Sequence, residues 1–279
     1  MTDLSYCAVQ VRDFDNDRFL ASLFASDDVR EDLFALYAFN LELSKVRETV
    51  SEPMIGRMRL QFWRDAVPGI AAGKPPAHAV AGPLADCVRR AGISEAELSA
   101  LIDARETDLD DVPHRDLAAL EDYAEKTSSS VMAMALRVLG ENPDRYPDML
   151  RAAGVGTALV GLVRAIPFQA QAGRVTLPAD LCARAGLDPA MPHQWPQNPD
   201  VREITRPLLA AAAAHLRDAR RHREKIDRRA LPAFLPLSLA GLYLRGLQRA
   251  GGDPARYGAH PPGVRRPLTV LWRSMLGRP

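Results

Sequence analysis

The sequence predicts an all-α protein that folds as a single domain. Its periodic segments are long, and their apolar residues recur at alternating steps of three and four, which is the spacing of one face of a helix. The alternation of apolar and polar residues that is typical of a strand is nearly absent. A chain of 279 residues, 47% of them hydrophobic, is also long enough to bury one large core.

Helix signals punctuate the first hundred residues. Asp13–Phe24 predicts a short helix, and the cluster Ser26-Asp27-Asp28 is a plausible N-cap for the helix that follows. A later helix, predicted over His78–Ala91, precedes a second start signal. There, Ser94 followed three residues later by Glu97 has the form of a capping box.

The stretch from Arg30 to Asp65 carries the most informative pattern in the sequence. Its first helix carries an apolar stripe from Leu36 to Val50, which indicates a buried face. On another face an apolar wall becomes polar at Ser44, Lys45 and Glu48, which share a side because they lie three and four residues apart. Such a wall is typical of a helix that lines a cavity. The alternative is a solvated pair of Lys45 and Glu48 on an ordinary surface.

Two polar clusters interrupt the helices predicted for residues 94–139. The helix predicted over residues 117–139 has four hydroxyl residues, Thr127 to Ser130, at its centre. Either its neighbours pack very closely there or the hydroxyl groups serve a ligand. The helix that starts at Ser94 leads into five acids within nine residues, for which a solvated charge cluster and a ligand or metal role both stay open. These acids are Asp103, Glu106, Asp108, Asp110 and Asp111.

The helix predicted over residues 151–171 is apolar and rich in glycine. Gly154, Gly156 and Gly161 lower its helix propensity, so they indicate close helix packing or room for a ligand. Pro167 cannot donate a backbone hydrogen bond, and we expect it to kink or end this helix.

The last third of the chain is predicted as a proline-rich loop, two amphipathic helices and a short tail helix. The loop covers Asp188–Pro199, the helices cover Arg202–Lys225 and Ala233–Arg249, and the tail helix contains Trp272. The basic run from Arg217 to Lys225 is typical of a solvated face. Contact with an acidic membrane surface or partner is the alternative.

Charge balance, cysteine spacing and the lengths of apolar runs indicate which partners and which location to expect. Basic and acidic residues nearly cancel, 36 against 35, so the net charge does not call for a nucleic acid. Three distant cysteines, Cys7, Cys87 and Cys182, lack metal-ligand spacing and favour a reducing compartment. There is no basic start followed by an apolar run, and no window approaches eighteen consecutive apolar residues. We therefore expect a cytoplasmic protein that is at most peripheral to a membrane.

Four segments stand out by their order along the chain. They are Arg30 followed by LFALYAFN, RLQFWRD from Arg59, Leu120-Glu121-Asp122-Tyr123 with SSSVMAMALRVLG shortly after, and GRVTLP from Gly173. In this order they resemble the squalene/phytoene synthase family over about residues 13–245. The resemblance implies one isoprenoid synthase-type helical bundle around a central cavity, formed by residues 1–279. Other motifs with chemistry, such as a glycine-rich phosphate loop, H-E-x-x-H or a nucleophile elbow, are absent from the sequence.

The resemblance also implies where a metal site would lie. In that family two aspartate-rich motifs hold Mg²⁺ ions that take up the charge of the departing diphosphate. The corresponding positions here are occupied by Ser44, Lys45, Glu48, Ala165 and Gln169. One carboxylate survives, and a lysine has entered whose ammonium group repels a divalent cation. We therefore predict no metal site, no cofactor and no catalytic residues.

Three further segments narrow the resemblance to one branch of the family. YAFNLELSKVRETVSE, MRLQFWRD and ALPAFLPLSLA are similar to the non-catalytic branch that acts in the assembly of mitochondrial respiratory complex I, NADH:ubiquinone oxidoreductase. That branch likewise lacks the metal aspartates. The resemblance implies a pseudoenzyme that serves the respiratory chain. Its partners would be complex I subunits or other assembly factors, in the cytoplasm or at the periphery of the inner membrane.

Two alternatives stay open. One is an isoprenoid or lipid carrier whose cavity holds its ligand without turning it over. The other is a head-to-head prenyl transferase that binds Mg²⁺ through atypical ligands, which would be Glu48, Glu106, Asp108, Asp110 and Asp111. For Tyr37 and Trp63 a purely structural role is the favoured interpretation. The residues that we expect to line the cavity or meet a ligand are Arg30, Tyr37, Leu41, Arg47, Tyr123, Lys126, Arg164 and Arg174.

Overall fold

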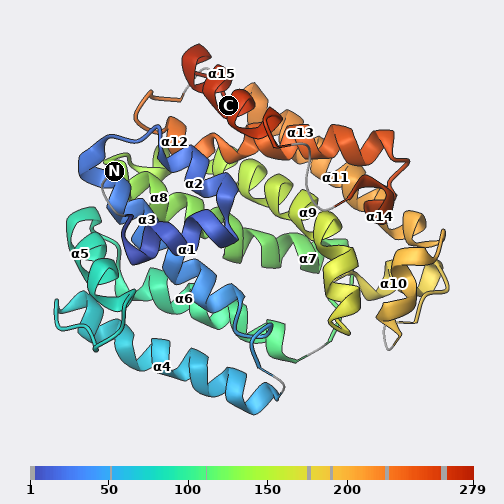
Figure 1. Cartoon of the computed structure of the whole chain (residues 1–279), viewed down its shortest axis with the longest axis horizontal. Coiled ribbons are helices and arrows are strands. Elements are labelled where there is room, and N and C mark those ends of the chain that lie inside the picture. The colour runs from blue at the N-terminus through green and yellow to red at the C-terminus, as the bar shows by residue number, and fades with distance from the viewer. Residues whose placement is uncertain are drawn as a thin grey trace.

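The chain is helical throughout the part that the structure describes (Figure 1). The computed structural model describes residues 4–50, 52–110, 112–174, 177–188, 191–223, 226–258 and 263–279. Within these ranges there is no strand, so the all-α prediction is confirmed. The α-helices are α1 Tyr6–Phe14, α2 Asn16–Ser22, α3 Asp27–Ser44, α4 Pro53–Ala71, α5 Ala81–Ala91, α6 Glu95–Glu106, α7 Leu117–Ala124, α8 Ser130–Val138, α9 Pro147–Gln171, α10 Ala179–Arg184, α11 Val201–Arg221, α12 Leu231–Phe234, α13 Pro236–Arg249, α14 Pro254–Tyr257 and α15 Arg265–Leu276. The shorter elements are η1 Thr107–Leu109, the π-helical turn η2 Glu125–Ser129, η3 Pro143–Arg145 and η4 Pro192–Gln197.

The core is one continuous cluster of buried hydrophobic side chains that extends from α1 to α15. At its centre α9 packs along α11, α13 and η2, while α3 packs against α1, α5 and α8. In Figure 1, α4 lies at one edge of the bundle and α15 at the opposite edge. By length and composition alone α9 could cross a membrane, but most of its apolar window is buried by neighbouring helices, as in the core helix of a globular bundle.

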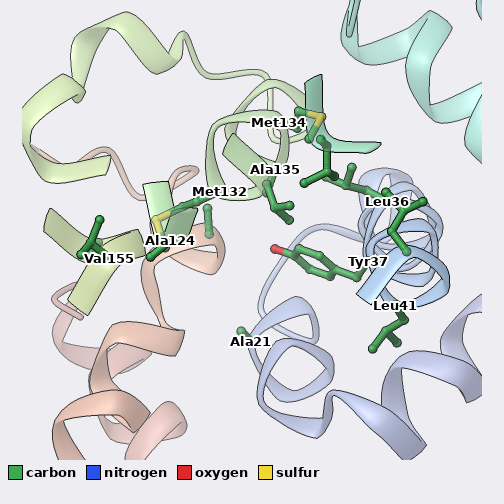
Figure 2. Packing of buried hydrophobic residues seen from close by; sticks show 14 of the residues in the cluster. Ala21, Leu36, Tyr37, Leu41, Ala124, Met132, Met134, Ala135 and Val155 are labelled. Atoms are coloured by element: carbon green, nitrogen blue, oxygen red, sulfur yellow. The ribbon is translucent and has the colours of Figure 1, made fainter. Parts of the chain in front are cut away.

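The helix α3 carries the predicted apolar stripe. Leu36, Phe39 and Leu43 are fully buried, and Val50 is buried beyond the helix end. In Figure 2 the Tyr37 side chain projects from α3 toward the side of α8 that carries Met132 and Ala135.

The predicted continuation of this helix beyond Ser44 is wrong, because α3 ends there and residues 45–49 form turns. The Thr49 hydroxyl donates to the backbone oxygens of Lys45 and Val46, both at 3.1 Å. Local side-chain bonds of this kind compete with helical backbone bonds. The polar wall is therefore formed by a helix end and a turn, not by one helix face.

The four hydroxyl residues at the centre of the predicted helix over residues 117–139 coincide with the π-helical turn η2 between α7 and α8. Gly154 of α9 packs directly on this turn, since a Cβ at that position would lie 2.6 Å from Ser129 Cα. Close packing therefore explains both the hydroxyl residues and Gly154. Gly156 is also crowded, by Leu216 of α11, whereas Gly161 has nothing within 4 Å of the position where its Cβ would lie.

The predicted single helix over Asp13–Phe24 is wrong, because the chain forms α1 and α2 on either side of Asp15. The Asp15 carboxylate accepts a hydrogen bond from the Arg18 backbone N–H at 3.2 Å and caps α2. An aspartate at such a position starts a new helix in preference to continuing the old one.

Other boundaries agree more closely with the prediction. The capping box of Ser94 and Glu97 is confirmed, and the helix predicted from His78 begins at Ala81. Pro167 lies inside α9 and does not end it, since the helix continues for about one more turn to Gln171. Parts of three predicted segments lie outside the described residues: Val175-Thr176, Pro189-Ala190 and Lys225.

Candidate functional site

Two adjoining cavities lie between α3 and α9, beside α6, η1 and α7. The first, which we call the motif cavity, has a volume of about 210 Å³, and its wall includes Glu48, Gln169 and Arg174. The second, the core cavity, has a volume of about 450 Å³, and its wall includes Leu41 and Ala165. The two cavities share four wall residues, which makes them neighbours across one partition: Ser44, Arg105, Tyr123 and Leu162.

The structure brings together four of the five positions that match the two metal motifs. Ser44 lies in both cavities, Glu48 and Gln169 in the motif cavity, and Ala165 in the core cavity. Lys45 is the exception, because its ammonium group lies over the ring of Phe14. Burial lowers the pKa of Lys45, while Glu48 and Glu42 act in the opposite direction.

The side chains at these positions do not fit a cluster of Mg²⁺ ions. The second motif offers the methyl group of Ala165 and the amide of Gln169, while Ser44 uses its hydroxyl to donate to the Leu41 carbonyl at 3.2 Å. Glu48 is the single carboxylate, and it is exposed. Mg²⁺ is held through carboxylate oxygens in near-octahedral geometry. Among the described residues no group of three or more His, Cys, Asp or Glu side chains could hold a metal ion.

The partition between the cavities contains a buried polar group that we call the Tyr123 cluster: Tyr123, Arg105 and Asp108. The Tyr123 hydroxyl donates to Asp108 Oδ1 at 2.6 Å and accepts from Arg105 Nη1 at 2.8 Å. Burial raises the pKa of Tyr123, and its bond to Asp108 adds to this effect. The tyrosine therefore stays neutral, and its hydroxyl is satisfied both as donor and as acceptor, whereas Arg105 Nε is buried without a hydrogen-bond partner among the described atoms.

At the core cavity, Asp17 of α2 organises a second polar group, the Asp17 cluster: Asp17, Arg164, Tyr243 and Arg266. Asp17 accepts from the Tyr243 hydroxyl at 2.7 and 2.8 Å and from Arg266 Nε at 3.0 Å. Arg164 Nη1 lies 3.9 Å from Asp17, and its guanidinium carbon lies 3.7 Å from the centre of the Tyr243 ring. Arg164, the arginine that precedes the second motif, is therefore placed beside a carboxylate of the protein itself.

Three predicted ligand residues lie outside the walls of the two cavities. Arg30 donates to the backbone oxygen of Ala25 at 2.9 Å and pairs with Asp27 at 2.8 Å, so it holds the turn between α2 and α3. Tyr37 is buried beneath the Arg18 guanidinium, and burial raises the pKa of Tyr37 to about 12. Lys126 lines a third cavity, which shares Thr107, Val112, His114 and Tyr123 with the motif cavity.

The remaining predicted residues contact the cavities. Leu41 and Arg164 line the core cavity, Arg47 and Arg174 line the motif cavity, and Tyr123 lines both. The Arg174 guanidinium donates to the backbone oxygen of Arg47 and so ties the end of α9 to the turn after α3. The charged and tyrosine wall residues of the two polar clusters that sequence reasoning missed are Arg105, Asp17 and Tyr243. Of these, only Arg105 leaves a local signal, since it stands one helical turn before Asp108.

The acidic cluster after Ser94 pairs with other parts of the bundle. Arg64 of α4 binds Asp103 and Glu106 at 2.8 and 2.6 Å, and Arg57 binds Asp110 at 2.8 Å. Asp108 belongs to the Tyr123 cluster, and Asp111 lies outside the described residues. These contacts are ion pairs that join α4 to α6 and η1.

An all-α bundle with a cavity between two long helices, at which two motifs meet, defines the class of isoprenoid synthase-type folds. The squalene/phytoene synthase family model matches residues 11–272, and the chain belongs to this family. A solved dehydrosqualene synthase shares the fold, with a TM-score of 0.79, 18% sequence identity and coverage of 97% of this chain and 94% of that one.

Relatives of two kinds are similar in sequence. A Bos taurus protein named "NADH dehydrogenase (ubiquinone) complex I, assembly factor 6" is 35% identical over 270 residues, covering 97% of this chain and 80% of the relative. The Homo sapiens protein of the same name is 34% identical, covering 89% and 74%. A presqualene diphosphate synthase of Rhodopseudomonas palustris is 27% identical, covering 73% of each chain.

Proposed function

We propose that this protein acts in the assembly of respiratory complex I as a non-catalytic member of its family. The observation that carries the proposal is the content of the cavity walls. The positions where two aspartate-rich motifs would face each other hold Ser44, Glu48, Ala165 and Gln169. Support comes from the similarity, at 33–35% identity, to mammalian proteins named for complex I assembly.

The electrostatics of the site support the non-catalytic part of the proposal. Ionising a prenyl diphosphate requires cations that concentrate on the leaving group, and a divalent metal normally supplies this charge. Here Arg105 and Arg164 are positioned beside Asp108 and Asp17 of the same chain. Each of these two guanidinium groups therefore has a carboxylate of the protein beside it, and Asp17 is shared between Arg164 and Arg266.

Deletion of the gene in its source organism tests the assembly role. We expect complex I to fall in amount on native gels and in NADH:quinone oxidoreductase activity, and the wild-type gene to restore both. The matched variant Glu48→Gln removes the single carboxylate of the first motif, and we expect it to restore complex I as fully as wild type. Intact complex I in the deletion strain would overturn the assembly role.

A direct assay tests the absence of chemistry. Purified protein is incubated with Mg²⁺ and farnesyl or geranylgeranyl diphosphate, and pyrophosphate release is measured. We expect release at the level of the buffer alone. Release that is lost in the Glu48→Gln variant would instead identify a prenyl transferase with an atypical metal ligand.

A lipid-carrying role is the second candidate, and one observation favours it. In the core cavity the side-chain oxygens Asn40 Oδ1 and Thr157 Oγ1 are buried without a hydrogen-bond partner among the described atoms. Such oxygens normally meet a partner, and an amphiphilic ligand would supply one. Native mass spectrometry of gently purified protein should then show a bound lipid that is depleted in a Thr157→Val variant. Protein that carries no lipid in either form would contradict this role.

A further inference from the structure

The helix α15 presents its apolar side away from the bundle. Val270 is fully buried and is the contact of this helix with the core, whereas the other large apolar side chains of the segment are 46–70% exposed. These exposed side chains follow one face of the helix: Val264, Leu268, Leu271, Trp272, Met275 and Leu276. A helix that packs on a globular core normally turns this stripe inward. In Figure 1, α15 lies at the edge of the molecule beyond α13.

An ion pair fixes this outward orientation. Arg266, on the opposite side of α15, points inward and donates to Asp17 of α2, with only 16% of its side chain exposed. Arg273, seven residues later, lies on the same inner side. Rotating the apolar face toward the core would break the pair between Arg266 and Asp17, so the exposed stripe is a built feature of the fold.

The part of the chain that carries α15 is strongly basic, although the whole protein is nearly neutral. Residues 228–279 contain nine arginines and one acid, Asp253, and the rest of the chain therefore carries an excess of acids. Asp253 itself binds Arg202 at 3.0 Å. Burial lowers the pKa of Arg220, as do the nearby charges of Arg273, Arg245 and Arg223, which lie toward the inner side of α15. Arg265 and Arg278, at the two ends of α15, are exposed.

We propose that the outer face of α15 docks this protein onto an anionic phospholipid bilayer. Apolar side chains together with an exposed tryptophan suit the interfacial layer, where the indole ring prefers to lie. The exposed Arg265 and Arg278, at the two ends of the helix, attract lipid phosphates. A second copy of the chain is a poorer occupant, because two basic surfaces would then face each other. The proposal goes beyond the role in complex I assembly and stands without it.

Intrinsic fluorescence offers a direct readout. The chain has three tryptophans, of which Trp63 and Trp195 are 3% and 2% exposed, while Trp272 is 61% exposed. Full-length protein is mixed with phosphatidylcholine vesicles that contain either no anionic lipid or about 30% phosphatidylglycerol. We expect a blue shift and quenching by brominated acyl chains with the anionic vesicles alone, and both should be lost in a Trp272→Gln variant.

A pair of methionine variants separates α15 from exposed apolar surface in general. Met275 and Met58 are both 66% exposed, and they belong to α15 and α4, two helices that lie at opposite edges of the bundle in Figure 1. In vesicle flotation, Met275→Ser should weaken binding about fivefold, whereas Met58→Ser should leave it unchanged. Raising the salt from about 0.1 M to about 0.5 M should release the protein.

Several outcomes would overturn the proposal. They are no binding to anionic vesicles, equal binding to neutral vesicles, or equal losses in the Met275→Ser and Met58→Ser variants. A dimer in sedimentation that dissociates in the Met275→Ser variant would assign the face to a second copy instead. None of these results depends on complex I, so failure here is distinguishable from failure of the assembly role.

Discussion

Two polar clusters border the core cavity, and they are built in different ways. In the Asp17 cluster one carboxylate joins α2 to Tyr243 and Arg266, which lie 226 and 249 residues away in sequence. In the Tyr123 cluster the partners Arg105 and Asp108 lie 18 and 15 residues away. In both clusters the charged groups pair with other residues of the protein. The Asp17 cluster joins four helices, whereas the Tyr123 cluster joins residues that lie close together in sequence.

This difference predicts how the two clusters contribute to the fold. Losing the Asp17 cluster should loosen α2, α9, α13 and α15 at once, because each of these helices supplies one of its members. Losing the Tyr123 cluster should affect mainly the end of α6, η1 and the end of α7.

The largest effect is expected for Asp17→Asn. The substitution leaves Arg266 and Arg164, whose side chains are 16% and 18% exposed, without their carboxylate, and we expect a loss of about 2–4 kcal/mol in the free energy of unfolding. Urea denaturation followed by circular dichroism measures it. In the Tyr123 cluster, Asp108→Asn should cost less, about 1–2 kcal/mol, because the hydroxyl of Tyr123 stays close.

The control for these variants is Asp13→Asn, which removes an exposed pair with the adjacent Arg12. Exposed pairs contribute little, so its stability should stay within about 0.5 kcal/mol of wild type. If Asp108→Asn destabilises the protein as much as Asp17→Asn, the distinction between a long-range tie and a local turn fails.

A smaller effect is expected for the two tyrosine hydroxyls. Tyr243→Phe and Tyr123→Phe should each cost about 1 kcal/mol, since each loses buried hydrogen bonds. Two double variants test whether each tyrosine belongs to the same cluster as Asp17. Combined with Asp17→Asn, Tyr243→Phe should add almost nothing, whereas Tyr123→Phe should add its full cost. Additive costs for Asp17 and Tyr243 would mean that their bond contributes no stability.

The sequence predicts much of the fold because helix signals are local. The capping box at Ser94 and the buried stripe from Leu36 follow from the spacing of a few residues, and both are confirmed. The break at Asp15 was missed, since an aspartate within an apolar pattern fits both a helix surface and a cap. Likewise, the sequence does not distinguish Gly161 from Gly154. Both lie in one glycine-rich helix, but only Gly154 is in close contact with a neighbouring element.

The site is less predictable, because its contacts join distant segments. The positions of Ser44, Ala165 and Gln169 were found through their order relative to a known pattern, and the structure places them at adjoining cavities. No local spacing of residues in the sequence predicts the ion pair between Asp17 and Arg266. The pair forms because α15 packs against α2, although 249 residues of sequence separate Asp17 from Arg266.

The smallest expected effect is a dependence of stability on pH, which we expect for the Tyr123 cluster and not for the Asp17 cluster. The His114 ring lies 4.9 Å from the Tyr123 ring, and burial lowers the pKa of His114 below its ordinary value of 6.5, although Asp108 opposes this shift. The unfolded chain therefore binds the proton more readily than the folded protein does. Stability is retained above about pH 6.5 and should fall as the pH decreases toward the pKa of the folded state. The Asp17 cluster contains no histidine and should not respond in this range.

Unfolding free energies measured between about pH 5 and pH 8 should show that wild type loses more stability on acidification than His114→Gln does. A wild type that gains stability relative to the variant at low pH would show that the attraction of Asp108 outweighs burial, and that the Tyr123 cluster is tuned to hold a cation.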